Sequence, residues 1–471
     1  MSFRGRLLTE AEQLERWKEY VDTVPILRSA VAVLQKISKK GYKAYITGGT
    51  VRDIILGLKP HDIDIATNMP IEQISSLYKT YDIGKSKDFG IVVVREGGYS
   101  YEVAQFREDG RYLDGRRPET VKVIGSFQKD AERRDFTINA MAVDMNGNII
   151  DYFDGRKDIQ NKVIRTVGNP LDRFGEDYLR MMRAARFSAK LGFDIEPETK
   201  KAAKTLATNI RDLAPERIKD EIWKAAAQSG DKFAKFLTEL DDMGILELIL
   251  PELTNLKGLE HNLEFHPEGH VWDHVLTALK ANQVADPLVN LAILLHDVGK
   301  GVTFDKKPDG TPIYYGHAEE GVKLVNQIAD RLRMSAKERE TLLYAVSNHM
   351  KFHKIIGMKP SKIAKLVSDE NWDVLVAVAR ADEFARGQKF MSDTDFESIV
   401  DTAVQIKKKW GAATMTKMMK IVDGNRVMEL TGLSPGPAVG RIIKIVTDWA
   451  IDNNVTDQDE IDKYILQVAK K

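Results

Sequence analysis

Two aspartates, Asp62 and Asp64, stand two residues apart in the apolar stretch HDIDIAT. Alternate side chains of an extended strand share one face, so both carboxylates are expected on the same side. Carboxylates that converge on one point repel each other unless a cation lies between them. An all-oxygen pair suits Mg²⁺, which proteins usually share with substrate phosphates. The spacing therefore predicts a magnesium site.

Two glycines, Gly48 and Gly49, precede this pair and separate a strand-like run from a helix-like run that contains Arg52. Glycines at such a turn let backbone N–H groups approach a triphosphate, and the start of the following helix favours its negative charge. A glycine turn alone is usually a cap, and a lone Asp-x-Asp is usually a surface loop. Their order within one short segment is more specific and predicts a nucleotide-phosphate site.

The combined pattern GG-x-VRD-(x)8-D-x-D resembles the head of the polymerase-beta-like nucleotidyltransferases, specifically class II CCA-adding enzymes and bacterial poly(A) polymerases. The resemblance implies two Mg²⁺ ions held by Asp62 and Asp64, one activating the primer 3′-hydroxyl and one holding the triphosphate during in-line displacement. It also implies a third catalytic carboxylate from a neighbouring strand. Glu102, in the strand-like run SYEVAQF, is the candidate. A cross-strand ion pair between Glu102 and an arginine is the alternative.

The segment RRDFTINA (133–140) is a second part of the resemblance. In the family this element contacts the ribose and phosphates of the incoming nucleotide. The resemblance thus implies nucleotide-binding roles for Arg133, Arg134, Asp135 and Asn139. A charge cluster at a helix N-terminus is the alternative interpretation of these residues.

The segment EDYLRMMR (176–183) is a third part, in which Asp177 and Arg180 are three residues apart and are expected on one helix face. The resemblance implies that they hydrogen-bond the nucleobase edge in place of a template. An arginine fork satisfies cytosine acceptors, and a carboxylate accepts from an exocyclic amine. A salt bridge within the helix is the alternative. Arg183 is expected to contact phosphates or to pack.

Basic residues are frequent between residues 107 and 134, where they suggest a phosphate-facing stripe or a solvated, salt-bridged surface. The glycine-punctuated segment 106–123 within this region is expected to be a mobile loop. It resembles loops implied in switching between C and A addition. The basic residues are Arg107, Arg111, Arg116, Arg117, Lys122, Lys129, Arg133 and Arg134.

Histidines form a second candidate site, because eight of the nine lie between residues 261 and 353. The dipeptide His296-Asp297 ends an apolar run, and the order of its flanking residues resembles the HD phosphohydrolase superfamily, an all-α fold that hydrolyses phosphate esters. The resemblance implies a divalent transition metal or Mg²⁺. The first metal site would comprise His274, His296, Asp297 and Asp382, and a second metal would use His317 and His349.

Other residues near this motif have less certain roles. Lys300 is expected to neutralise developing phosphate charge. No role is assigned to His261, His266, His270 or His353, and one of them could replace one of the six proposed ligands.

Composition and patterning set the wider frame. The 471 residues predict two to four domains, and the absence of cysteine excludes disulfides, zinc ribbons and thiol catalysis. No apolar run is long enough to span a membrane and no signal peptide is evident, so a cytoplasmic location is expected. The 70 basic and 70 acidic side chains cancel, which argues mildly against a nucleic-acid binder.

The expected fold is α+β and multidomain: a small polymerase-beta-like α/β head, an all-α neck and body, and an all-α HD domain. PERIKDEI (215–222) resembles a helical motif of the family that supports the neck without contributing chemistry, and TGLSPGPAVGRII (431–443) resembles its C-terminal helix break. The expected ranges are a helical lead-in at 1–24, the head at 25–168, the neck and body at 169–255, the HD domain at 256–395 and a helical region at 396–471.

The resemblance implies addition of CCA to tRNA from CTP and ATP, with an additional phosphatase or 2′,3′-cyclic phosphodiesterase activity in the HD domain. Lysines in the segment 406–420 are expected to contact the tRNA backbone. A poly(A) polymerase or an enzyme adding only A or only CC would share nearly every motif. A hydrolase whose head merely binds RNA is a third possibility, although the head motifs are intact.

Overall fold

The computed structural model describes residues 9–60, 62–81, 90–110, 121–261, 269–387, 392–410 and 422–470. The chain divides into two compact units, Met1–Ala225 with Lys235–Ile249, and Ala226–Ala234 with Leu250–Lys471. None of the described helices is both long and apolar enough to cross a membrane. Some residues singled out above lie outside the described ranges: Arg111, Arg116, Arg117, His266 and the stretch 411–420.

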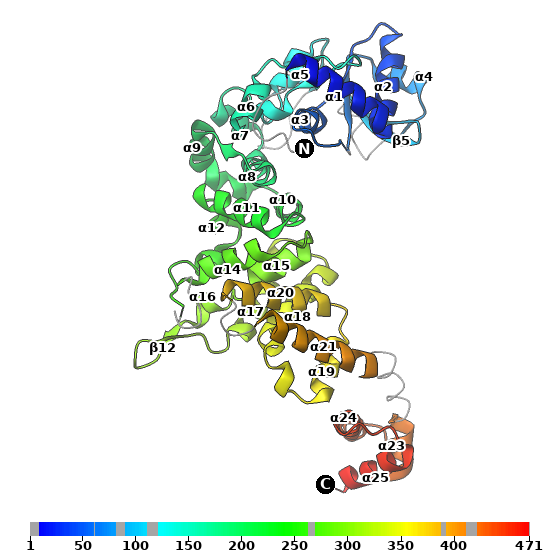
Figure 1. Cartoon of the computed structure of the whole chain (residues 1–471), viewed down its shortest axis with the longest axis vertical. Coiled ribbons are helices and arrows are strands. Elements are labelled where there is room, and N and C mark those ends of the chain that lie inside the picture. Colours follow the sequence, from blue (N-terminus) through cyan, green and yellow to red (C-terminus); the bar gives the residue numbers. More distant parts are fainter. Residues whose placement is uncertain are drawn as a thin grey trace. The chain divides into compact units, whose positions relative to one another are not determined.

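A seven-stranded mixed sheet forms the centre of the first unit (Figure 1), which confirms the expected α/β head. Strand order is β3-β4-β5-β2-β1-β8-β9, with β2 and β5 parallel and the other neighbours antiparallel. The strands are β1 (Ala44–Thr47), β2 (Asp64–Thr67), β3 (Thr80–Tyr81), β4 (Ile91–Glu96), β5 (Tyr99–Gln105), β8 (Ala142–Val143) and β9 (Ile149–Ile150).

The apolar face of α2 (Pro25–Ser38) packs against one face of the sheet. Leu27, Ala30, Leu34 and Ile37 recur at three- and four-residue spacing and are all buried, as expected for an amphipathic helix. The Tyr101 hydroxyl of β5 donates a hydrogen bond of 2.8 Å to the carbonyl oxygen at the start of α2. The preceding helix, α1 (Glu10–Thr23), begins with a capping box at Thr9 and Glu12.

Helices follow the sheet in the first unit. α8 and α10 are joined by a buried ion pair, in which Arg186 Nε lies 2.5 Å from Glu221 Oε2. Two short strand pairs lie outside the main sheet: β6 (Arg107–Asp109) pairs antiparallel with β7 (Val121–Val123), and β10 (Val163–Ile164) pairs parallel with β11 (Asp194–Ile195). The helices are α3 (Gly49–Ile55), α4 (Ile71–Leu77), α5 (Phe127–Glu132), α6 (Gly155–Asn161), α7 (Pro170–Glu176), α8 (Leu179–Leu191), α9 (Pro197–Leu206), α10 (Pro215–Ala226), α11 (Gly230–Asp242) and α12 (Leu246–Ile249).

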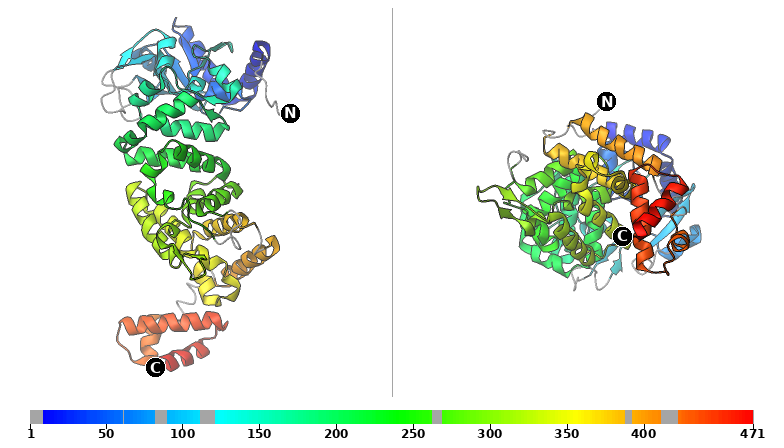
Figure 2. Two further views of the ribbon diagram at one scale, coloured as in Figure 1. Left: turned by 90° about the vertical axis from the view of Figure 1, so that its left-hand side faces the viewer. Right: turned by 90° about the horizontal axis from the view of Figure 1, so that it is seen from below.

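The second unit is helical around α15, whose sequence PLVNLAILL is apolar on nearly every side and is almost wholly buried. α14, α15, α18 and α20 pack against one another (Figure 2). A small hairpin of β12 (Asp305–Lys306) and β13 (Pro312–Ile313) modifies the all-α expectation for this region. The helices here are α13 (Pro251–Thr254), α14 (Val271–Ala281), α15 (Pro287–Leu295), α16 (Lys300–Thr303), α17 (His317–Arg331), α18 (Ala336–Phe352), α19 (Pro360–Val367) and α20 (Trp372–Ala385).

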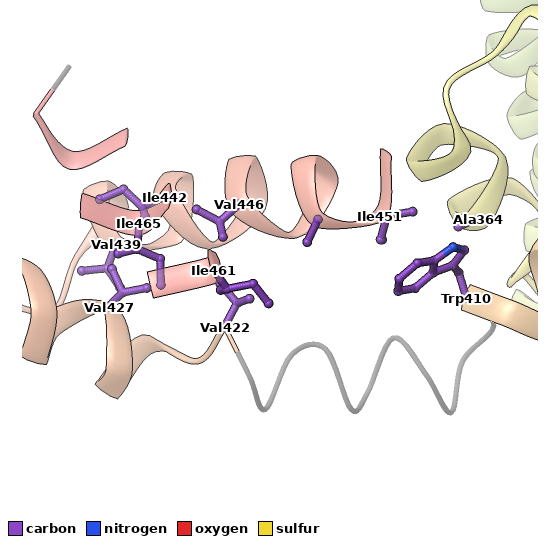
Figure 3. Packing of buried hydrophobic residues seen from close by; sticks show 11 residues of the cluster. Ala364, Trp410, Val422, Val427, Val439, Ile442, Val446, Ile451, Ile461 and Ile465 are labelled. Atoms are coloured by element: carbon purple, nitrogen blue, oxygen red, sulfur yellow. The ribbon is translucent and has the colours of Figure 1, made fainter. Parts of the chain in front are cut away.

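The C-terminal helices are α21 (Asp393–Trp410), α23 (Gly424–Thr431), α24 (Pro437–Asp452) and α25 (Gln458–Ala469). The apolar side chains of α23, α24 and α25 form a cluster with Trp410, in which Val427, Val446 and Ile461 are fully buried (Figure 3). The other buried residues of α21 pack with α18, α19 and α20. The expected break at LSPGPAVG is present: Gly432 ends α23 in the left-handed conformation with φ of 67°, and Pro437 begins α24.

The close approach of Gly299 to α17 gives a stability prediction. A Cβ at this position would lie 1.9 Å from the carbonyl oxygen of His317 and 2.6 Å from the amide nitrogen of Gly321. Gly299→Ala must therefore displace α17, and we expect a loss of about 1–3 kcal/mol. Thermal unfolding of the full chain should show the corresponding transition lowered by about 2–4 °C for each kcal/mol lost.

Gly440→Ala is the matched control, because Gly440 lies within α24 and no atom would lie within 4 Å of the added Cβ. Replacing a helical glycine with alanine should leave stability unchanged or raise it by up to about 1 kcal/mol. If Gly299→Ala and the wild type unfolded at the same temperature, the close approach of Gly299 to α17 would be contradicted.

Candidate active sites

Three carboxylates meet where β2 and β5 run side by side. Asp64 is the register partner of Glu102 in this parallel pair, and Asp62 and Asp64 are exposed on either side of the buried Ile63. Solvent reaches Asp64, yet the surrounding protein partly desolvates it. That desolvation raises the pKa of Asp64 to about 6, with repulsion from Asp62 and Glu102 acting in the same direction and Arg134 opposing. The predicted carboxylates are thus close enough to repel one another.

The glycine turn lies directly against these carboxylates. Gly48 follows β1 with φ of 72°, and a Cβ there would lie 3.6 Å from Asp64 Oδ2 and 3.5 Å from Arg134 Nη1. The Thr50 hydroxyl donates a 2.7 Å hydrogen bond to the carbonyl oxygen of Asp62, which ties the turn to the segment that carries the paired aspartates. The backbone of the turn therefore forms one wall of the site, as the sequence predicted.

A cleft of about 510 Å³ opens over the carboxylates and is lined by six arginines: Arg52, Arg133, Arg134, Arg180, Arg183 and Arg217. Two of these are oriented by Asp130, which is buried near the end of α5. Arg133 Nη2 lies 2.8 Å from Asp130 Oδ1, and Arg134 Nη2 lies 3.1 Å from Asp130 Oδ2. Burial alone would raise the pKa of Asp130, but the two arginines outweigh it and lower that pKa. The adjacent arginines follow α5, so they are not a helix N-terminal charge cluster.

Asp135 organises a buried network on another wall. Its Oδ2 accepts a 2.9 Å hydrogen bond from Arg183 Nε, and its Oδ1 accepts a 3.1 Å hydrogen bond from Asn139 Nδ2. The Asn139 side-chain oxygen in turn accepts a 2.7 Å hydrogen bond from Arg52 Nη1. Burial opposes ionisation of Asp135, but Arg183 and Asn139 outweigh it, so its pKa falls to about 2.

The structure corrects the expected placement of Asp177. This residue lies in an extended conformation between α7 and α8, with φ of −150°, and does not share a helix face with Arg180. Its carboxylate accepts two hydrogen bonds, of 3.1 Å and 2.8 Å, from the guanidinium of Arg217. The side chain of Arg180 instead bonds to Glu176 and to the carbonyl oxygens of Arg173 and Arg133.

Arg217 was missed by the sequence reasoning, which gave the PERIKDEI helix no part in the chemistry. It comes from the first turn of α10 and lines the cleft beside Asp177. Forty positions separate the two residues in the sequence, so no local spacing could reveal their pairing. Asp130 was also missed, although its i,i+3 and i,i+4 spacing to Arg133 and Arg134 was a usable signal.

The six predicted histidine-site ligands come together in the second unit. Ligand atoms of His274, His296 and Asp382 lie within 4.8 Å of one another, and so do those of Asp297, His317 and His349. The sequence had placed Asp297 with the first of these groups.

Asp297 in fact faces both groups. Its Oδ2 lies 3.3 Å from His296 Nε2, and its Oδ1 lies 3.5 Å from His317 Nε2. Burial opposes its ionisation, but Lys300 and the histidines hold the pKa of Asp297 well below its ordinary value. Burial lowers the pKa of His349 to about 3, which leaves its imidazole neutral near pH 7.

Further polar side chains surround these ligands. Lys300 Nζ lies 2.5 Å from Asp297 Oδ2 and 3.3 Å from His261 Nε2, so the lysine contacts a candidate ligand directly. His353 Nε2 lies 3.2 Å from Asp382 Oδ2, whereas His270 is exposed before α14. Of the histidines without an assigned role, His261 and His353 therefore adjoin the site.

Three family models match successive parts of the chain. Residues 44–165 match the poly A polymerase head domain, residues 192–257 the probable RNA and SrmB-binding site of polymerase A, and residues 270–387 the HD domain. These matches follow the same order as the candidate sites.

Curated relatives include the CCA-adding enzyme of Lacticaseibacillus paracasei, 48% identical over 200 residues that cover 42% of this chain and 50% of the relative. The alignment to this relative thus spans about half of its length. The CCA-adding enzyme of Leuconostoc mesenteroides is 30% identical over 456 residues, covering 95% of this chain and 96% of the relative.

Solved structures are similar over nearly the whole chain. The CCA-adding enzyme of Bacillus stearothermophilus in complex with CTP has a TM-score of 0.72 and 25% identity, covering 95% of this chain and 98% of that one. A Thermotoga maritima CCA-adding enzyme complexed with tRNA shares the fold, with a TM-score of 0.58 and 18% identity over 96% of this chain and 98% of that one. The resemblance inferred from the motifs is confirmed, and the chain belongs to the CCA-adding enzymes.

Proposed function

We propose that this protein adds CCA to the 3′ end of tRNA, using CTP and ATP and no nucleic-acid template. The observation that carries the proposal is a set of three carboxylates beside a glycine turn, of which Asp64 and Glu102 line a cleft together with six arginines. The carboxylates suit the reacting centre, and the arginines suit a triphosphate. The relatives named above are CCA-adding enzymes, which supports tRNA as the acceptor.

The carboxylates fit Mg²⁺ by their chemistry. Asp62, Asp64 and Glu102 offer only oxygen donors. Desolvation raises the pKa of Asp64, and repulsion from Asp62 and Glu102 acts in the same direction, as expected where a cation would neutralise the group. These residues would hold the ions. When bound, Mg²⁺ supplies positive charge to the transferring phosphoryl group and favours ionisation of the primer hydroxyl.

The remaining residues of the cleft bind and orient the nucleotide. Arg133 and Arg134, held in place by Asp130, present N–H groups to the phosphates. Gly48 and Gly49 let the backbone approach the same phosphates. Asp135 and Asn139 position Arg183 and Arg52 at the cleft wall.

Asp177 and Arg180 select the nucleobase, and Arg217 positions Asp177. Arg217 donates two hydrogen bonds to the Asp177 carboxylate, which has about four lone-pair sites and so retains room for an exocyclic amine. A carboxylate in fixed orientation rejects uracil and guanine, because their edges leave buried polar groups unpaired. Selectivity thus depends on a residue outside the EDYLR segment.

The first prediction concerns the carboxylates. Asp62→Ala together with Asp64→Ala removes the ligands that would hold Mg²⁺, and nucleotide incorporation should fall by about a thousandfold or more. The assay uses tRNA transcripts ending before CCA, after the first C and after CC, with products sized at single-nucleotide resolution. Retained incorporation would contradict the catalytic assignment.

The same assay separates the alternatives in the wild type. Extension that stops after CCA, with CTP and ATP used and GTP and UTP refused, supports CCA addition. A long adenylate ladder would make the protein a poly(A) polymerase, and addition of only A or only CC would make it a partial enzyme.

The second prediction concerns Arg217. Arg217→Gln releases the Asp177 carboxylate from its bidentate partner, and discrimination between CTP and UTP should fall by about tenfold, equivalent to about 1.4 kcal/mol. Arg217→Lys should restore part of it. Single-turnover incorporation of each triphosphate on the same transcripts measures the ratio.

Arg186→Gln is the matched control for Arg217→Gln. It breaks an ion pair of α10 with α8, between Glu221 and Arg186, and Arg186 is not among the residues that line the cleft. The control should lower stability and leave the triphosphate ratio unchanged. If both variants changed the ratio of CTP to UTP incorporation equally, Arg217 would have only a structural role.

We further propose that the histidine site hydrolyses a phosphate ester at an RNA terminus. The observation in its favour is the two groups of candidate ligands that share Asp297. Mixed imidazole and carboxylate donors suit a divalent transition metal or Mg²⁺, which would supply Lewis acidity at the phosphorus centre. In hydrolysis a water oxygen forms a new bond to phosphorus, the ester P–O bond breaks, and a proton passes to the departing ribose oxygen.

The third prediction concerns this site. His296→Ala together with Asp382→Ala should reduce bound divalent metal, measured by mass spectrometry, and abolish hydrolysis of 2′,3′-cyclic AMP. Incorporation by the head should be unchanged. His270→Ala, an exposed histidine outside the ligand groups, should alter neither quantity. Undiminished hydrolysis in the double variant would contradict the assignment.

A further inference from the structure

A lysine-lined groove adjoins the histidine site. We propose that it binds the backbone of single-stranded RNA, so that the histidine site acts on the 3′ end of an RNA strand in preference to a mononucleotide. The proposal names the substrate class of the hydrolysis proposed above and rests on it. The residues concerned, Lys351, Lys354 and Lys362, are called the lysine track below.

The groove has a volume of about 540 Å³ and lies between the end of α18 and α19. All three residues of the lysine track line it and are exposed. Lys354 also lines the cavity of about 520 Å³ that contains Asp297, His317 and His349. Lys354 therefore lines both the groove and the histidine cavity, so an RNA strand held in the groove can extend to the candidate metal ligands.

The helical period of α18 produces this arrangement. His349 and His353 are four residues apart and point toward the histidine cavity, which both of them line. Asn348 and Lys351 are three residues apart and line the groove instead. The sequence NHMKFHK (348–354) thus places metal chemistry and phosphate binding on neighbouring faces of one chain segment.

The charge of the lysine track is not neutralised within the described residues. Lys351 Nζ donates to the neutral Asn348 side chain at 2.8 Å, and neither Lys354 nor Lys362 forms a described ion pair. Lys365, at the far end of the groove, does pair with Asp448 at 2.5 Å. The groove lining itself contains no acidic residue. Exposed lysines without carboxylate partners suit a polyanion better than a single phosphate.

An exposed aromatic ring stands at the rim of the histidine cavity. Tyr315 lies just after β13, lines this cavity and is 78% exposed. Single-stranded RNA is commonly held by aromatic rings that stack on bases and by positive charge that follows the phosphates. Here Tyr315 would stack on a terminal base while the lysine track holds phosphates further from the end. A mononucleotide would contact the ring, Lys354 and the candidate metal ligands but would leave Lys351 and Lys362 unused.

The test compares two substrates in the full chain loaded with divalent metal. One is a single-stranded RNA of about 10 nucleotides that ends in a 2′,3′-cyclic phosphate, and the other is 2′,3′-cyclic AMP. Lys351→Gln together with Lys362→Gln leaves Lys354 in place, because Lys354 also lines the histidine cavity, and should raise KM for the RNA by about fivefold or more at low salt, with kcat retained. KM for cyclic AMP should not change.

The salt dependence of KM tests the same lysine–phosphate contacts independently. Loss of two phosphate contacts should flatten the plot of log KM against log salt by about 1.4 for the RNA, and leave the plot for cyclic AMP unaltered. The matched control, Lys280→Gln with Lys337→Gln, removes the same charge from exposed lysines of the second unit that do not line the groove. Equal effects of both double variants, or no effect of either, would overturn the proposal.

Failure of the inference and failure of the hydrolysis are distinguishable. If both substrates are hydrolysed and the lysine substitutions leave both KM values unchanged, the proposed hydrolysis stands and RNA binding in the groove is overturned. If neither substrate is hydrolysed, acetylation of lysines with and without the RNA decides the question, read by mass spectrometry. Protection of Lys351, Lys354 and Lys362, but not of Lys337, would then support the groove, and absence of protection would overturn it.

Discussion

Repulsion between carboxylates is the constraint on which the rest of the first unit depends. The parallel register of β2 and β5 sets Asp64 beside Glu102, and the strand period brings Asp62 to the same side. Desolvation raises the pKa of Asp64, and repulsion from Asp62 and Glu102 adds to it. A sheet with an antiparallel neighbour in place of β5 would change which residues lie opposite one another. The mixed topology therefore brings the candidate Mg²⁺ ligands together.

Arginines on the wall of the cleft place positive charge near these carboxylates. Asp130 and Asp135 hold arginines of the cleft wall in fixed directions. Both carboxylates are buried, and they stay ionised because hydrogen bonds and the arginines stabilise their charged form. Their guanidinium groups then face the cleft as a preformed site for phosphates. Fixing donors before the nucleotide arrives reduces the entropy lost on binding. Carboxylates thus serve in two ways here: exposed ones attract cations, and buried ones orient arginines.

The sequence predicted the sheet-forming segments and the break before α24, because these features follow local rules. The resemblance to the family supplied most of the site residues, and the structure brings the three head carboxylates, and likewise the six histidine-site residues, close to one another. Alternation around Ile63 revealed the shared face of Asp62 and Asp64, and the neighbouring run revealed Glu102. The position of Asp177 was wrong, since the helical pattern of EDYLRMMR conceals a change to extended backbone between α7 and α8. The pairing with Arg217 depends on how distant helices pack, and no period in the sequence encodes that.

The division of the histidine ligands illustrates the same limit. Sequence order indicated the six residues, but only the packing of α14, α15, α17, α18 and α20 shows that Asp297 faces both groups. A carboxylate that lies between two sets of imidazoles couples them, because any cation in one set changes the charge felt by the other. Lys300 now contacts that same carboxylate, and its positive charge would oppose a nearby metal cation. A metal held by Asp297 would therefore compete with Lys300 for the same carboxylate, and Lys300, which lines the cavity, would lie within reach of a phosphate bound there.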